Sequence, residues 1–134
     1  MTKLVDIEGI GEAYSSKLLN AGISSVEALL ESCGAKPARK NLAEKSGISE
    51  MRILNWVNRA DLARISGVST QYADLLESAG VDTVPELAQR NAENLQQKMA
   101  ERNEEVHLVR KVPSLSQVQS WVAQAKELPR KITH

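Results

Sequence analysis

Cysteine and histidine, the ligands typical of zinc and iron–sulfur sites, are scarce in this sequence. It has one cysteine, two histidines and no phenylalanine. The lone Cys33 has no partner for an intramolecular disulfide, and with His107 and His134 it forms no spacing typical of a zinc or iron–sulfur site. We therefore expect no metal and no cofactor. A chain of 134 residues can bury a hydrophobic core without them.

Long apolar runs and an excess of one charge are also missing. No segment approaches the roughly 18 to 20 consecutive apolar residues that a membrane-spanning helix requires. The start of the chain lacks the layout of a signal peptide, so we expect a cytoplasmic protein with no membrane partner. Seventeen basic and seventeen acidic side chains cancel. The overall positive field that draws many proteins to nucleic acids is therefore absent.

The chain has very few clusters of β-branched residues, and aromatic residues make up only 3% of it. Alanine, leucine, glutamate, lysine and glutamine dominate instead, which predicts an all-α fold. Helix ends are also marked, and only the basic tail 130–134 is expected to fray. The expected left-handed C-terminal caps are Gly22, Gly47 and Gly80. The expected capping boxes are Thr83 with Glu86 and Ser114 with Gln117.

An internal repeat organises the chain. Residues 4–29 match residues 62–87 at a constant offset of 58 positions. The clearest matches are Leu4 with Leu62, Ile7 with Ile65, Gly9 with Gly67, Tyr14 with Tyr72, Leu18 with Leu76, and Gly22 with Gly80. A tryptophan-bearing helix follows each copy, at Trp56 and at Trp121. We interpret the chain as a duplication with copies at 1–61 and 62–134, the second carrying about seven extra residues before Pro113.

A short glycine motif lies near the start of each copy. Gly9, Ile10 and Gly11 stand between two short amphipathic segments, and this arrangement resembles the helix-hairpin-helix motif. In that motif, backbone amides beside the positive end of a helix donate to a nucleic-acid phosphate. Such contacts carry no sequence information. The resemblance implies two helix-hairpin-helix units packed into one compact SAM-like helical bundle. The implied nucleic-acid-binding residues are Gly9, Ile10, Gly11 and Lys17 in the first copy, and Gly67 and Ser69 in the second.

A wider resemblance covers nearly the whole chain. It rests on Gly67-Val68, the stretches 83–87 and 91–95, and Pro113-Ser114-Leu115 leading to Trp121. On these residues the chain is similar to an uncharacterised bacterial family of tandem helix-hairpin-helix proteins, a domain of unknown function. The resemblance implies a fold and supplies no activity.

Local charge weakens the nucleic-acid interpretation. Helix-hairpin-helix proteins that grip DNA usually place Lys or Arg directly after the glycine turn, where this chain has Glu12 and Ala13. Segments 4–31 and 65–93 each carry a net charge of −4, whereas 36–64 carries +4 and 102–134 carries +3. We therefore expect phosphate, if bound, at the first turn, aided by Lys17 and basic residues of the connecting segment. Alternatively, the glycines only allow a turn with positive φ.

Other patterns suggest further sites. Residues 39–57 fit helix-turn-helix spacing, which would place Ser49, Glu50, Arg52 and Asn55 in a major groove. Against this, Gly47 is already explained as a helix cap. The two tryptophans are expected in the core rather than stacked on bases. His107 is expected on a solvated surface, and Cys33 in a loop.

The sequence leaves two hypotheses about function. No nucleophile stands in a recognisable catalytic setting, so we expect neither an enzyme nor a small-molecule substrate. The first hypothesis is a module that contacts DNA or RNA backbones weakly and without sequence preference. The second is a protein-interaction adaptor, binding a partner or another copy of itself, in which the hairpins are purely structural.

Overall fold

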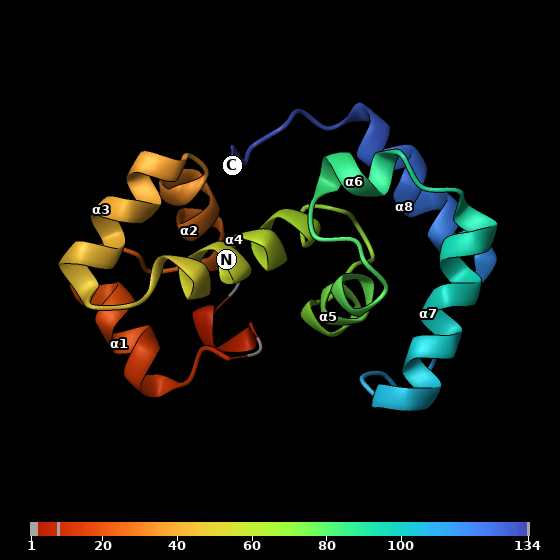
Figure 1. Cartoon of the computed structure of the whole chain (residues 1–134), viewed down its shortest axis with the longest axis horizontal. Coiled ribbons are helices and arrows are strands. Elements are labelled where there is room, and N and C mark those ends of the chain that lie inside the picture. Colours follow the sequence, from red (N-terminus) through yellow and green to blue (C-terminus); the bar gives the residue numbers. More distant parts are fainter. Residues whose placement is uncertain (1–2, 8, 134) are drawn as a thin grey trace. The chain divides into compact units, whose positions relative to one another are not determined.

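Helices and turns make up the described part of the chain. The computed structural model describes residues 3–7 and 9–133, and these residues contain no strand (Figure 1). The predicted all-α class is confirmed. The elements are a 3-10 helix η1 (Leu4–Asp6) and the helices α1 (Glu12–Asn20), α2 (Val26–Cys33), α3 (Lys36–Ser46), α4 (Glu50–Leu62), α5 (Thr70–Ser78), α6 (Val84–Ala88), α7 (Ala92–Val106) and α8 (Leu115–Glu127). None of these helices combines the length and apolarity needed to cross a membrane.

The chain divides into two compact units. Unit 1 consists of Met1–Asp61 together with Lys131–His134, and unit 2 consists of Leu62–Arg130. Unit 1 thus includes the end of the chain, which the sequence repeat would place with the second copy. The buried apolar side chains form two clusters, one in each unit. Each unit therefore has a hydrophobic core of its own.

The core of unit 1 is built from short amphipathic helices. Helix α3 packs against both α1 and α2, and α1 also contacts η1. One face of α4 supplies Ile53, Trp56, Val57 and Ala60, whose spacing places them on the same side of the helix. Ser25 caps α2, because its hydroxyl accepts a hydrogen bond from the amide of Ala28 at 3.1 Å.

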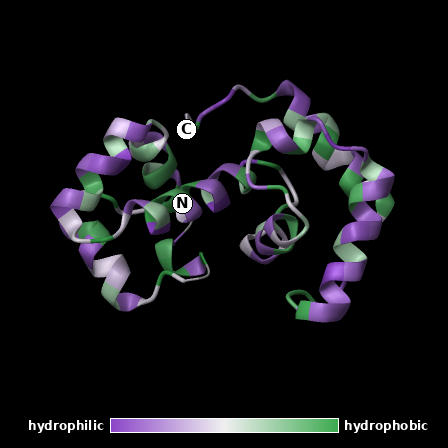
Figure 2. Cartoon of the chain, in the orientation of Figure 1, coloured by the Kyte–Doolittle hydropathy of each residue, from purple (hydrophilic) through white to green (hydrophobic). Residues whose placement is uncertain are grey.

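The core of unit 2 includes a longer helix. Helix α7 packs against α5 and α8, and α8 also packs against α6. Although α7 is largely hydrophilic in Figure 2, Leu95 and Met99 lie one turn apart on it and are fully buried. The predicted capping box of Ser114 and Gln117 is present.

The second predicted capping box is wrong. Thr83 accepts no capping hydrogen bond from the backbone of α6. Its hydroxyl instead donates to a carboxylate oxygen of Glu86 at 3.4 Å. The Thr-x-x-Glu spacing thus brings the two side chains together without forming the reciprocal backbone bonds.

Matching glycine turns end the first long helix of each unit. Gly22 and Gly80 have φ values of +90° and +95°, as expected for C-terminal caps. In unit 1 the amide of Ile23 donates to the carbonyl of Leu18 at 2.9 Å, and in unit 2 the amide of Val81 donates to Leu76 at the same distance. This is the hydrogen-bond pattern of a Schellman motif. Gly47 ends α3 with φ +77°, which confirms the third predicted cap.

Residues 131–133 of the C-terminal tail pack on the rest of unit 1, so the expectation that the tail frays is wrong there, while His134 lies outside the described residues. Ile132 is only 2% exposed and belongs to the core of unit 1. The Thr133 amide donates to the carbonyl of Gly34 at 2.8 Å. The buried guanidinium of Arg39 donates to the carbonyls of Cys33, Gly34 and Thr133. Three charge-assisted hydrogen bonds from one side chain join the end of α2 to the tail.

Cys33 is not a loop thiol as expected, because it is the last residue of α2 and is 2% exposed. Burial raises the pKa of its thiol, and the nearby positive charge of Arg39 opposes this effect only in part. Burial likewise lowers the pKa of the Arg39 guanidinium. A buried thiol with a raised pKa is a poor nucleophile.

We predict that Gly34→Ala destabilises unit 1 by displacing the tail. A Cβ at this position would lie 2.2 Å from the backbone oxygen of Lys131, so one of the two segments must shift. The expected loss of unfolding free energy is about 1–3 kcal/mol, measured by urea denaturation followed by circular dichroism. Ser32→Ala, at the neighbouring exposed position, is the control. Equal stability of the two variants would contradict the docked tail.

We also predict that Cys33 reacts slowly with thiol reagents in the folded protein. At pH 8 its alkylation should be at least about tenfold slower than in the urea-unfolded chain, because the thiol is buried and little thiolate forms. The matched control is Ser32→Cys in a Cys33→Ser background, which places a thiol at an exposed position and should react rapidly. Rapid modification of native Cys33 would show that the end of α2 is open.

Candidate nucleic-acid interface

The turn Gly9-Ile10-Gly11 leads from η1 into α1. The Ile10 amide donates to the carbonyl of Ile7 at 3.1 Å, and the Ile10 side chain is 3% exposed. Ile10 therefore packs in the core, and its side chain is not available to a ligand. Gly9 and Gly11 are both exposed at the surface. Only the backbone of this turn faces solvent.

The first glycine of each turn is required by the fold. Gly9 and Gly67 have φ values of +92° and +94°, which disfavour any residue with a Cβ. A Cβ on Gly9 would lie 3.5 Å from the indole nitrogen of Trp56, and one on Gly67 would lie 3.1 Å from that of Trp121. At these two positions, the need for a turn with positive φ is enough to explain the glycines without a bound phosphate.

Gly11 is different, because nothing in the fold demands a glycine there. It has φ −87° and ψ −176°, an extended conformation open to any residue, and a Cβ would meet no atom within 4 Å. In unit 2 the same position is Ser69, with a similar φ of −77°, and its hydroxyl accepts from the amide of Tyr72 at 3.2 Å. Gly11 has no side chain that could cap α1 in this way. The start of α1 therefore lacks the cap that Ser69 gives to α5.

Two cations from different helices converge on the ring of Tyr14, which follows this turn. The Nζ of Lys17 lies 5.7 Å from the ring centroid of Tyr14, and the guanidinium carbon of Arg52 lies 5.2 Å from it. Both distances are within the range of a cation–π interaction. Tyr14 is in the first turn of α1, and its ring packs edge-on against Trp56 with centroids 5.2 Å apart. Lys17 thus has a basic neighbour from the connecting segment.

Sequence reasoning missed Tyr14 and assigned Arg52 to another role. A signal was present, because Arg52 precedes Trp56 by four residues and therefore lies on the same face of α4. Of the residues placed in the possible major-groove set, Ser49 caps α4 by accepting from the amide of Arg52 at 3.2 Å. Arg52 itself contacts Tyr14.

In unit 2 the cations come from another part of the chain. Tyr72 packs against Trp121 with ring centroids 5.3 Å apart. The position equivalent to Lys17 is Leu75, which is fully buried. The predicted residues Gly67 and Ser69 are exposed, but neither has a counterpart of Lys17 beside it. The basic residues near this turn are instead in the loop after α7.

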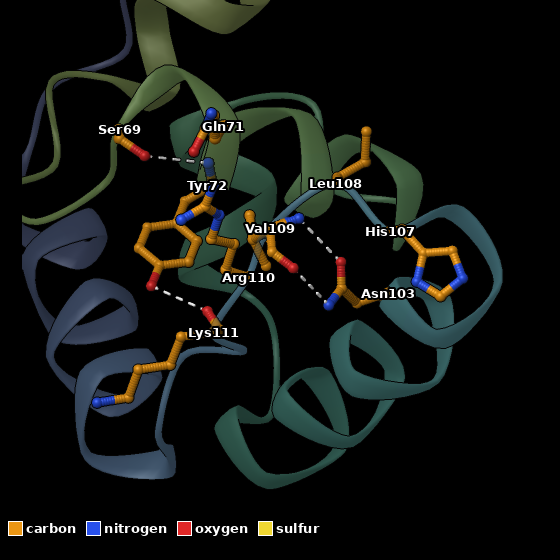
Figure 3. A pocket seen from close by; sticks show the side chains of 9 residues that line it. All are labelled: Ser69, Gln71, Tyr72, Asn103, His107, Leu108, Val109, Arg110 and Lys111. Atoms are coloured by element: carbon orange, nitrogen blue, oxygen red, sulfur yellow. Dashed lines mark hydrogen bonds between the residues drawn. The ribbon is translucent and has the colours of Figure 1, made fainter.

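An open pocket of about 830 Å³ lies between the start of α5 and that loop. Figure 3 shows the side chain of Arg110 turned toward Tyr72, with Lys111 and His107 at opposite ends of the pocket. His107 is the C-cap of α7, with a left-handed φ of +50°. The pocket is lined by Ser69, Gln71, Tyr72, Asn103, His107, Leu108, Val109, Arg110 and Lys111. Within residues 3–7 and 9–133, no group of three metal-ligating side chains comes together.

Comparison with known proteins identifies a family but no activity. A family model described as "Domain of unknown function (DUF4332)" matches residues 8–128. No curated protein and no solved structure matches the chain.

We predict opposite effects of substitution at the two glycines of the first turn. Gly9→Ala should destabilise the protein by about 1–2 kcal/mol, since it forces a Cβ into a positive-φ conformation. Gly11→Ser should leave stability unchanged or raise it by a few tenths of a kcal/mol, because a serine caps a helix slightly better than glycine. Urea denaturation of both variants tests this. A loss at Gly11 as large as that at Gly9 would mean that the turn itself requires both glycines.

Proposed function

The chain belongs to this family of domains of unknown function. Because the family supplies no activity, we propose a function from the chain's own residues. The protein is a non-enzymatic helix-hairpin-helix module that binds nucleic-acid backbones weakly and without sequence preference. The contact surface in unit 1 is the start of α1 at Gly11, together with Lys17 and Arg52. Such a protein acts in the cytoplasm, where nucleic acid is accessible.

Three matched features support the interpretation of the chain as duplicated helix-hairpin-helix units. Each unit has a positive-φ glycine against a tryptophan indole, a tyrosine that packs on that tryptophan, and a glycine-capped helix end. The hydrogen bonds that close the turns also correspond, with Ile10 to Ile7 in unit 1 and Val68 to Ile65 in unit 2, both at 3.1 Å.

The convergence of Lys17 and Arg52 on Tyr14 is the observation that carries the proposal. A salt bridge would neutralise a cation, whereas the contact with an aromatic ring leaves its charge able to attract a phosphate. The ring lies in the first turn of α1, where uncapped amides and the helix dipole favour an anion. Two positive side chains therefore lie over the ring of a residue in the first turn of α1.

The absence of a capping side chain at Gly11 also supports this site. A phosphate oxygen could approach the first amides of α1 without meeting a Cβ. Glu12 opposes the approach, since it is an exposed carboxylate in the same turn. Its repulsion is consistent with weak binding. Phosphate contacts of this kind position a nucleic acid and do not read its bases.

The protein-interaction adaptor is the second candidate, and exposed apolar side chains favour it. Leu19 on α1 is 60% exposed and Met51 on α4 is 74% exposed. Met51 also lines a small pocket of about 250 Å³ with Leu54. Large apolar side chains at a surface are typical of protein contacts when they gather in one patch. In this candidate function, the hairpins only support the fold.

We predict that the double substitution Lys17→Gln and Arg52→Gln weakens duplex DNA binding about tenfold at about 50 mM salt. The plot of log affinity against log salt should flatten by about 0.9 for each lost phosphate contact. Fluorescence anisotropy with a labelled duplex gives both values. Lys40→Gln with Lys45→Gln removes the same charge from exposed positions on α3 and is the matched control.

The two candidate functions give different results in this experiment. If the double variant and its control bind the duplex equally, the surface around Tyr14 is not the site. If the wild-type protein binds no duplex even at low salt, the nucleic-acid proposal is overturned and the adaptor remains. Gly11→Ser gives a separate check, because its hydroxyl would occupy the amides that a phosphate needs while the fold is preserved.

A further inference from the structure

The loop that follows α7 is held in a defined conformation. The side chain of Asn103 makes two hydrogen bonds to the backbone of Val109, accepting from its amide at 3.0 Å and donating to its carbonyl at 2.9 Å. The hydroxyl of Tyr72 donates to the carbonyl of Lys111 at 3.1 Å. These bonds, shown in Figure 3, fix both Val109 and Lys111, which flank Arg110. The basic side chains therefore project from an ordered support.

His107 sets the direction of this loop. It adopts the left-handed conformation that ends α7, and its amide donates to the carbonyl of Asn103 at 2.8 Å. A residue with a Cβ is strained in this region. The Asn103 bonds to Val109 help offset that strain. The resulting turn brings residues 108–111 back toward the start of α5, where they line the pocket.

The pocket is positive and also partly apolar. Arg110 and Lys111 are exposed, and no acidic side chain lines the pocket. Leu108 and Val109, both half-buried, also line it, as does Tyr72. The start of α5 is already capped by Ser69. The positive charge of this pocket therefore comes from the loop cations rather than from a free helix end.

This combination of chemistry fits a single-stranded nucleic acid better than a duplex. Proteins that bind single strands combine cations for the phosphates with aromatic or apolar surface for unpaired bases. A volume of about 830 Å³ lies in the range of small-molecule pockets and is ample for one nucleobase. In a duplex the bases are paired and stacked, so they cannot enter a pocket of this kind.

We propose that the pocket of unit 2 binds single-stranded nucleic acid, with Arg110 and Lys111 contacting phosphates and the surface of Leu108, Val109 and Tyr72 receiving a base. This inference rests on the proposed nucleic-acid function and extends it. Unit 1 contacts backbones through its turn and Tyr14, while unit 2 adds a site that only an unpaired strand fills. The two units therefore differ in the form of nucleic acid that they prefer.

The test compares two probes on the full chain. A labelled oligothymidine and a labelled duplex of the same length are titrated by fluorescence anisotropy at about 50 and 200 mM salt. The variant carries Arg110→Gln and Lys111→Gln. The control carries Lys98→Gln and Lys126→Gln, which removes the same charge from exposed positions on α7 and α8 outside the pocket. Circular dichroism confirms that both variants are folded.

The expected result is a selective loss of single-strand binding. The pocket variant should bind oligothymidine about tenfold more weakly than the control, with a salt slope lower by about 0.7 for each lost contact. Its duplex affinity should match that of the control. Tyr72→Phe removes only the hydroxyl that holds the carbonyl of Lys111, and it should weaken oligothymidine binding by a smaller factor.

Three results would overturn the inference. Equal oligothymidine binding by the variant and the control would remove the pocket as a site, while duplex binding by the wild-type protein would still support the proposed function. Equal losses for both probes would show that the loop contacts backbones of either form, with no single-strand site. A wild-type protein that binds neither probe would overturn both this inference and the proposed function.

Discussion

The packing of a tryptophan indole against a positive-φ glycine is the contact on which the rest of each unit depends. Trp56 lies against Gly9 and Trp121 against Gly67, which places each turn on the tryptophan-bearing helix of its unit. Each tryptophan also packs against a tyrosine, which lies in the first turn of the helix that follows the glycine turn. The turn, the helix start and the tyrosine ring are thus held together by one buried aromatic side chain.

The two units share this aromatic framework but obtain their positive charge in different ways. In unit 1, Lys17 and Arg52 reach Tyr14 from two helices. In unit 2, the position of Lys17 is taken by the buried Leu75, and the cations come from the loop after α7. The net negative charge of segments 4–31 and 65–93 therefore does not decide the charge beside each tyrosine. Basic residues from the connecting segments lie beside both turns, and this arrangement is central to both proposals.

Local patterns in the sequence predicted the helices and their caps well. Errors arose where a side chain had another hydrogen-bond partner available. Composition and apolar spacing predicted helices, and glycines after helical runs predicted three left-handed caps, all of which are present. The Thr83 box failed because that hydroxyl bonds to the Glu86 carboxylate instead of the backbone. For the candidate site, the sequence pointed to Gly11 and Lys17 but missed Tyr14. It also treated both glycines of the first turn alike, although only Gly9 has a positive φ.

The sequence by itself determined the all-helical class, the helix ends and the turns. These features depend on interactions between residues a few positions apart, such as i to i+4 hydrogen bonds and glycine caps. Only the tertiary structure decided that Arg52 joins Lys17 on Tyr14, that the tail packs against Gly34, and that the loop of Arg110 borders the start of α5. Each of these contacts joins residues more than thirty positions apart. Their proximity depends on how whole helices pack around a core, which no local pattern in the sequence specifies.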